Sequence, residues 1–419
     1  MAHIRRVSTL FDCTDVCPEG YDPLGSIDPV FQTNSWGFFE NPYYTTDSAT
    51  MDDILFQYDI TICQSQANFG VKASRPQAWA KNIVAVGGVN HRDTLTTTDD
   101  SWLHPDPPEC VLQLPASHGP AEDNRIKPDF THFFDEVSTT DNGNTFTDCF
   151  GGTSAATPIT CGYFGLFYQM WSAGHFGNFV SPACDPQIMN CVFEHRPHMT
   201  TAKAMMINTS RMYVFAGQFP PNPDLTRDKQ GWGLADVGKL YVHGVGDKFK
   251  LIIDETDLVD AVQTAAYLIT VDAGAYELKV TLVYADPMGD PKATRAFIND
   301  LNLALRSPSG ALYWGNTGLL DANWSQPGGA PNSIAVDTVE NIFVQSPGAG
   351  QWKVGVSTKG INEDGHVETP ALDADFALVV SVDFDCNGNL SPDSFDIAHF
   401  PTTWPDSNNN GVPDACESP

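Results

Sequence analysis

The sequence predicts an α/β domain over residues 1–245, an all-β sandwich over 246–384 and a short tail over 385–419. In the first part, short β-rich runs end in glycine or asparagine and are followed by helical patterns, as is typical of buried parallel strands. From about residue 248, alternating strands with Gly and Pro turns recur at short intervals, which favours a sandwich. The tail contains a polar pattern that occurs twice.

In the first domain, strands are expected within 59–70 (DITICQSQANFG) and 82–90 (NIVAVGGVN). A helix is predicted over 153–174, because apolar or small residues recur there every three or four positions. Pro158 fits the first turn of that helix, where backbone N–H groups have no helical partner. A second helix is predicted over 200–213.

In the second domain, alternating patterns predict strands within 266–284, 299–316, 341–357 and 375–384. The SPSG segment at 307–310 has the composition of a hairpin turn. These strands together are sufficient for a two-sheet sandwich.

The composition narrows the class of protein. With 419 residues and 42% hydrophobic content, the chain can form two or three packed domains. Its net charge of −30 disfavours nucleic acid and anionic membranes as partners. No run of 18 apolar residues predicts a membrane span, and the first residues do not have the pattern of a signal peptide.

Ten cysteines fit disulfide bonds and an extracellular or cell-envelope location, although no export signal is recognised. Cys386 and Cys416 bracket the tail and could join its two halves. Cys63, Cys149 and Cys161 lie in apolar patterns, so they are also candidates for free buried thiols.

The segment GGTSAATP, residues 151–158, places Ser154 where the predicted helix begins. A helix N-terminus lends positive potential to a developing oxyanion, and the preceding glycines let a substrate approach the backbone. Ser154 is therefore a candidate nucleophile, provided that a base removes its proton. The alternative is an ordinary helix cap, a frequent role of serine.

Further motifs accompany this segment: QTNSWG at 32–37, QANFG at 66–70, SHGP at 117–120, RIKPDF at 125–130 and QGWGLADV at 230–237. Together they resemble the subtilisin-like serine peptidases with a C-terminal β-sandwich, over roughly residues 25–385. The resemblance implies a partial subtilisin-like parallel sheet with helices on both faces, followed by a jelly-roll-like sandwich. It also implies hydrolysis of protein or peptide substrates through an acyl-enzyme.

The resemblance assigns roles to matching positions. Ser154 matches the nucleophile and Asn68 the side-chain donor of the oxyanion hole. The positions that match the substrate-binding segments are Ser35, Trp36, Gly37, Gly152 and Thr153. Taken alone, Asn68 could be a turn residue and Trp36 a core aromatic residue.

The family's catalytic Asp and His motifs should precede the SWG segment, but neither D-[ST]-G nor HGT-x-V-A-G occurs in the 34 residues before Ser35. Three explanations remain open: a truncated sequence, a degenerate paralogue, or a second polypeptide that supplies the missing part. A degenerate paralogue would be a peptide- or surface-binding module. The histidines between the two matched motifs are interpreted as surface or structural residues: His91, His104, His118 and His132.

Two departures from the family pattern keep the degenerate paralogue open as an explanation, because a truncated sequence does not account for them. Ala67 stands where the family has a glycine before the oxyanion asparagine, and its Cβ could displace that donor. FTHFFDEV, residues 130–137, replaces an Ala-Pro-Gly turn.

The tail pattern places oxygen-bearing side chains at positions i, i+2, i+4 and i+8, twice, with an offset of 21 residues. Such spacing suits Ca²⁺ and resembles thrombospondin type 3-like and dockerin-like repeats, here without the Glu at position 12 of an EF-hand. A merely polar, flexible tail is the alternative. The candidate ligands are Asp385, Asn387, Asn389 and Asp393, then Asp406, Asn408, Asn410 and Asp414. Weaker candidates lie in the sandwich, where ordinary turn residues are the alternative: Asp286, Asp290, Asn299 and Asp300.

Overall fold

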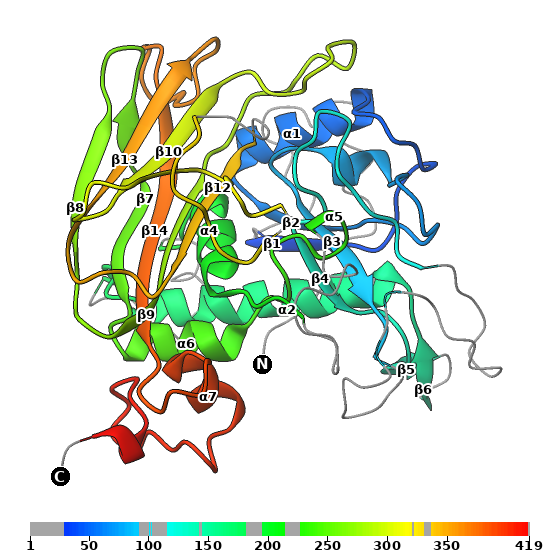
Figure 1. The fold of residues 1–419 in the computed structure, drawn as a ribbon. Coiled ribbons are helices and arrows are strands. Elements are labelled where there is room, and N and C mark those ends of the chain that lie inside the picture. Colours follow the sequence, from blue (N-terminus) through cyan, green and yellow to red (C-terminus); the bar gives the residue numbers. More distant parts are fainter. Residues whose placement is uncertain are drawn as a thin grey trace.

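The structure is a computed structural model that describes residues 29–91, 100, 102, 115–141, 145–181, 195–213, 227–320, 322–330 and 337–417. An α/β domain, a domain of two β-sheets and a tail follow one another along the chain (Figure 1). None of the helices in these ranges is both long and apolar enough to cross a bilayer.

A parallel sheet forms the centre of the first domain. Its strands lie in the order β1 (Phe31–Asn34), β2 (Thr61–Ser65), β3 (Val84–Val89) and β4 (Phe130–Phe133). All three neighbouring pairs are parallel, as the sequence predicts for a mixed α/β domain. β2 and β3 fall within the two predicted ranges.

Helices cover both faces of this sheet, and they include α1 (Thr46–Tyr58) and α2 (Thr153–Ser172). Successive residues of a strand point to opposite faces. On β2, Cys63 packs in the cluster that contains Phe164 of α2, whereas its neighbour Ile62 packs with Leu55 of α1. The arrangement is consistent with the predicted subtilisin-like sheet.

The proline of α2 does not lie in the first turn, as the sequence analysis expected. The helix begins at Thr153, so Pro158 is its sixth residue. Proline lacks the N–H that would bond the carbonyl four residues earlier, which is that of Ser154. This carbonyl instead accepts a hydrogen bond from Ser35 Oγ at 2.8 Å. The proline thus frees a polar group beside the candidate site.

The remaining elements of the first domain are η2 (Pro76–Trp79), β5 (Val137–Asp141), β6 (Thr145–Phe150), α4 (Met199–Thr209), α5 (Arg227–Gln230) and α6 (Val237–Val245). β5 and β6 form a separate hairpin that the sequence did not predict. All residues of α4 are buried, because this helix lies between the parallel sheet and the second domain (Figure 1).

The second domain consists of two antiparallel sheets that share one hydrophobic core. One sheet has the order β11 (Leu312–Trp314), β10 (Asp300–Arg306), β13 (Gly350–Gly360) and β8 (Ala265–Val271). The other has the order β12 (Val339–Gln345), β9 (Ala275–Val283), β14 (Ala374–Phe384) and β7 (Phe249–Val259). The turn between β10 and β11 is the predicted one, and β7 was not predicted.

A buried ion pair connects the two domains at Asp286, one of the weaker calcium candidates. Lys81 Nζ lies 2.6 Å from Asp286 Oδ2, and neither side chain is exposed. The Asp286 carboxylate also accepts the backbone N–H groups of Ile298 and Asn299, each at 2.8 Å. Asp286 therefore pairs with a lysine at the domain boundary.

The tail packs against the rest of the chain through α7 (Asp393–His399) and ends in η4 (Asp414–Cys416). His399 Nε2 lies 2.7 Å from Asp236 Oδ2, and Asp236 caps α6. A disulfide joins Cys386 to Cys416 with a Cα–Cα distance of 6.0 Å.

Of the three candidate free thiols, Cys63 and Cys161 are free and buried. Cys149, however, is disulfide-bonded.

Candidate active site

The start of α2 and the loop after β2 meet at Gly152 and Asn68. Gly152 has φ 80°, a conformation that favours glycine. A Cβ at this position would lie 2.8 Å from Asn68 Nδ2. Glycine is thus required both by the backbone and by the close approach of the Asn68 carboxamide.

Two hydrogen bonds fasten the Asn68 loop to the first turn of α2. The Thr153 N–H donates to Asn68 Oδ1 at 2.8 Å, and the Ala67 N–H donates to Thr153 Oγ1 at 3.2 Å. Ser154 follows directly in α2 and is partly exposed. The structure therefore brings Asn68, Gly152, Thr153 and Ser154 together from segments about 85 residues apart.

Ala67 has a backbone conformation that suits glycine. Its φ is 111° and its side chain is fully buried. The Ala67 carbonyl accepts the Ser117 N–H at 2.7 Å, which holds the residue from a third segment. Residues kept in such sparsely populated regions cost about 1–3 kcal/mol each. The departure that the sequence shows at this position is consequently a source of strain next to the candidate oxyanion donor.

The segment from Ser35 to Gly37 lies next to Ser154. The Ser35 carbonyl accepts a hydrogen bond from the Ser154 hydroxyl at 3.1 Å. The carbonyls of the next two residues accept bonds from Gln64 Nε2 at 2.6 Å and from an Arg75 guanidinium nitrogen at 3.1 Å. Trp36 is 42% exposed, so it is not a core aromatic residue.

No histidine among the described residues forms a hydrogen bond with Ser154. His132 is buried between Phe133 and Tyr163, and burial lowers its pKa to about 3, with the charges of Arg211 and His91 acting in the same direction. His132 therefore stays neutral.

The other predicted structural histidines bond elsewhere. His91 Nδ1 lies 2.8 Å from Asp135 Oδ1, and His118 Nδ1 lies 2.8 Å from the Gly119 carbonyl. These contacts agree with the structural interpretation. His104 lies outside the described residues.

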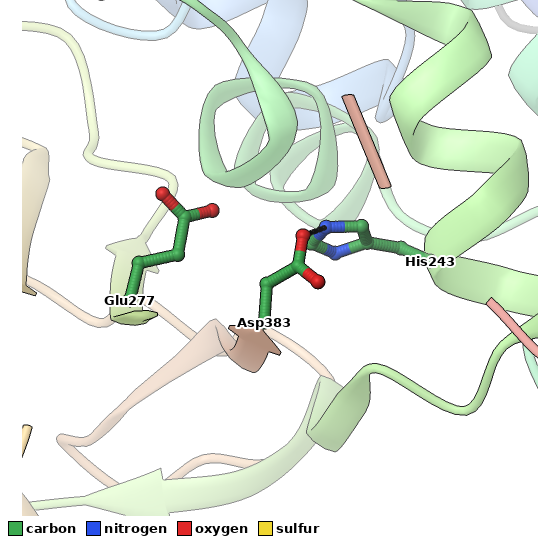
Figure 2. A group of neighbouring side chains, drawn as sticks. All are labelled: His243, Glu277 and Asp383. Carbon is green, nitrogen blue, oxygen red and sulfur yellow. Dashed lines mark hydrogen bonds and ion pairs between the residues drawn. The ribbon is translucent and has the colours of Figure 1, made fainter. Parts of the chain in front are cut away.

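A second group of a serine, a histidine and a carboxylate lies where the domains and the tail meet, and the sequence analysis missed it. His243 of α6 faces Asp383 of β14, with Glu277 of β9 nearby (Figure 2). His243 Nε2 lies 3.3 Å from Asp383 Oδ2 and 3.1 Å from Ser394 Oγ, and the Ser394 hydroxyl also bonds to Asp383. Ser394 belongs to α7.

Three lysines neutralise the carboxylates of this group. Lys239 Nζ lies 2.6 Å from Glu277 Oε1, Lys279 Nζ lies 3.8 Å from the same carboxylate, and Lys248 Nζ lies 3.9 Å from Asp383. The polar side chains of the group around His243 are also buried, so the group is not accessible to a substrate. We conclude that it is structural. Because His243 and Asp383 are 140 residues apart, no local motif indicates their contact.

Each tail loop converges on a carboxylate that the sequence analysis overlooked. Asn387 and Asn389 donate their amide N–H groups to Asp396 Oδ2 at 2.7 and 2.9 Å. In the second loop, Asn408 donates to Glu417 Oε1 at 2.9 Å and Asn410 donates to the same oxygen. Asp396 and Glu417 are the twelfth residues counted from Asp385 and Asp406, so counting alone could have found them. The expectation that the loops lack the Glu at position 12 is therefore wrong for the second loop, whereas an Asp takes that position in the first.

The other predicted tail ligands shape the loops. Asp385 and Asp406 accept backbone N–H groups three to five residues later, which closes each loop. Asp393 Oδ1 accepts the Cys386 N–H at 2.9 Å, while its other oxygen is buried without a hydrogen-bond partner among the described residues. Asp414 bonds to the backbone and hydroxyl of Ser407 instead. The structure thus brings the residues at loop positions 3, 5 and 12 together, but not those at position 9.

Comparison with known proteins finds only distant similarity. No family model matches the sequence. A Dictyostelium discoideum protein described as "Serine protease/ABC transporter B family protein tagA" is 25% identical over 262 residues, which cover 56% of this chain and 14% of that protein. The chain therefore spans about one-seventh of that relative's length.

Solved structures with some similarity include the patellamide maturation protease PatA and the prenylagaramide maturation protease PagA. PatA superposes with a TM-score of 0.34 and PagA with 0.33, each at 15% identity. Each comparison covers 51% of this chain and 61% of the other. Neither superposition is close enough to define the fold.

Proposed function

We propose that this chain is a serine endopeptidase of the subtilisin type, which hydrolyses peptide bonds in protein or peptide substrates through an acyl-enzyme on Ser154. The observation that carries the proposal is the contact between the start of α2 and Asn68, in which Asn68 Oδ1 holds the Thr153 N–H at 2.8 Å. The printed description of the Dictyostelium relative as a serine protease supports the same activity.

In this mechanism, Ser154 Oγ attacks the carbonyl carbon of the scissile bond. The oxyanion that forms accepts hydrogen bonds from Asn68 Nδ2 and from the Ser154 N–H, which belongs to the first turn of α2 and has no helical acceptor there. The hydroxyl needs a general base. No described residue fills that role, so the base has to come from outside the described residues or from another chain.

One observation favours a second candidate function, a catalytically inactive peptide- or surface-binding module. The Ser154 hydroxyl bonds to the Ser35 carbonyl rather than to an imidazole. Exposed aromatic side chains flank the two segments of the candidate site and could hold an apolar peptide without chemistry: Trp36, Phe38, Phe39 and Phe69.

Labelling with a fluorophosphonate separates the two functions, since this reagent modifies only an activated serine. For the peptidase we expect the natural full-length protein to become labelled, and Ser154→Ala to abolish the label. Ser394→Ala is the matched control, because Ser394 contacts a histidine but is buried, and it should leave labelling unchanged. An unlabelled natural protein that still binds peptides would establish the binding module instead.

For the tail, we propose structural Ca²⁺ sites. Hard oxygen ligands at alternate loop positions and an acidic residue at position 12 suit this ion. To bind it, the four asparagine amides would present oxygen where they now present N–H. The ligands would be Asp385, Asn387, Asn389 and Asp396, then Asp406, Asn408, Asn410 and Glu417.

We further propose an extracellular or cell-envelope location. The disulfide between Cys386 and Cys416 supports an oxidising compartment, because such bonds seldom persist in a reducing cytosol.

A further inference from the structure

The loop between β13 and β14 gathers a histidine and three carboxylates that the candidate active site and the tail do not use. One nitrogen or oxygen atom from each of His366, Glu368 and Asp375 lies within 4.8 Å of the other two. His366 Nε2 is 3.5 Å from Glu368 Oε2, and His366 Nδ1 is 3.3 Å from Asp373 Oδ1. The two ring nitrogens therefore face different carboxylates.

Several buried polar atoms of this loop have no hydrogen-bond partner. Asp375 is only 8% exposed, and among the described residues no hydrogen bond or ion pair reaches its carboxylate. Asp373, which is 9% exposed, has an Oδ1 atom without a hydrogen bond, and Thr369 Oγ1 is buried without one as well. A buried carboxylate that is left unpaired is costly, so the loop is built for a ligand that supplies positive charge.

The surroundings supply only part of this charge, because the positive charge of His198 acts on the Asp375 carboxylate while the charges of Glu255 and Glu368 oppose it. Glu255 of β7 lies next to the group, and its carboxylate bonds to His198 Nδ1 at 2.8 Å. No described lysine or arginine lies within ion-pair distance of Glu368, Asp373 or Asp375. The group around His243 differs in this respect, because three lysines lie against its carboxylates.

We propose that His366, Glu368 and Asp375 bind a divalent transition cation of the Zn²⁺ class, with Asp373 as a positioning residue for the imidazole. Imidazole nitrogen and carboxylate oxygens are typical ligands of Zn²⁺. A ligating histidine usually donates its other ring N–H to a carboxylate. Asp373 Oδ1 lies 3.3 Å from His366 Nδ1 without a hydrogen bond between them, and a turn of the imidazole on binding the ion would form that bond. Three protein ligands leave a fourth position for water. The ion would fasten the loop to the first residues of β14.

The test is a calorimetric titration of the metal-stripped full chain with Zn²⁺, in buffer that contains saturating Ca²⁺ so that the tail loops do not interfere. We expect one Zn²⁺ per chain. His366→Ala and Asp375→Asn should each weaken binding at least about 10- to 100-fold, since even outer-shell changes have effects of this size. The matched controls His175→Ala and Asp272→Asn change the same residue types elsewhere and should bind like the wild type.

Thermal melting gives a readout that does not depend on affinity. Asp375→Asn replaces a buried carboxylate that no described lysine or arginine pairs, so it should raise the melting temperature of the metal-free protein while abolishing the further rise on adding Zn²⁺. Absence of Zn²⁺ binding by the wild type would overturn the proposal. So would undiminished binding by both variants, because the ion would then lie elsewhere.

Discussion

Two serines in this molecule have opposite shortcomings as nucleophiles. Ser154 is partly exposed at the start of α2 beside Asn68, but its hydroxyl donates to a backbone carbonyl. Ser394 contacts both His243 and Asp383, but it is fully buried, and its hydroxyl also bonds to the carboxylate. The first serine has a candidate oxyanion donor but no base among the described residues, and the second has an imidazole without room for a substrate.

The difference shows that residue types alone do not define a catalytic site. A general base must face the hydroxyl proton, and the reacting carbonyl must reach both the hydroxyl and the oxyanion donors. At Ser394 these conditions fail because packing between α6, β14 and α7 excludes any substrate. At Ser154 the geometry is consistent with catalysis, and only the base is missing from the described residues.

The largest expected effect concerns Ser154 and tests whether Asn68 assists its reaction. Asn68→Ala should slow acylation of Ser154 by about 10²–10³, since it would remove the proposed oxyanion donor. The measurement is the rate of fluorophosphonate labelling under conditions where the wild type reacts. Asn178→Ala, just beyond the other end of α2, is the control. Equal rates for both variants would show that Asn68 is a turn residue.

Removal of Ca²⁺ should destabilise the part of the molecule that holds Ser394. Asp393 and Asp396 flank Ser394 in α7, so an ion in the first tail loop would fix the helix that carries it. At 100 times the dissociation constant, one bound ion stabilises the folded state by about 2.7 kcal/mol. We expect a chelator to lower the melting temperature, and Asp396→Asn together with Glu417→Gln to abolish this sensitivity. A chelator response that survives in the double variant would place the ions elsewhere.

Acid should weaken the junction at Ser394. Burial lowers the pKa of His243. For Asp383, burial raises the pKa, but the hydrogen bond and charge of His243 outweigh burial and hold the pKa below its usual value. Both groups bind fewer protons when folded, so their stabilisation is complete above the unfolded histidine pKa of about 6.5 and declines as the pH falls. Lys239 and Glu277 adjoin the pair.

Urea unfolding at pH 7.5 and at pH 5 measures this effect. His243→Gln should remove the part of the decline between about pH 6.5 and 5 that arises from the imidazole. If the variant and the wild type lose stability in parallel over this range, other groups are responsible.

The smallest expected effect concerns the strain beside Ser154. Ala67→Gly should relieve the positive φ, which offsets the usual loss of about 0.5–1 kcal/mol for glycine and leaves stability unchanged or slightly raised. Ala85→Gly in β3 is the matched control, because Ala85 is also fully buried but lies in an ordinary strand, so it should destabilise the protein. Chemical denaturation measures both. Equal losses in the two variants would contradict strain at Ala67.

Local patterns in the sequence were enough for two of the four parallel strands, β2 and β3, for the main helix and for most sandwich strands. β7 was missed because its residues are mostly only half-buried, and the β5–β6 hairpin because its strands are largely exposed. Pro158 was assigned to the wrong turn, since the sequence does not show that Ser35 replaces its missing hydrogen bond.

The sequence by itself determined the α/β order, the location of Ser154 at a helix start, the second set of tail oxygens and the absence of the family's Asp and His motifs. These are features of spacing and residue type within short segments. Only the tertiary structure decided that Lys81 forms an ion pair with Asp286, that Ser394 contacts His243, and that Asp375 is buried without a lysine or arginine partner among the described residues. Each of those depends on the contact and solvent exclusion of side chains, and segments distant in the sequence acquire both only when the chain packs.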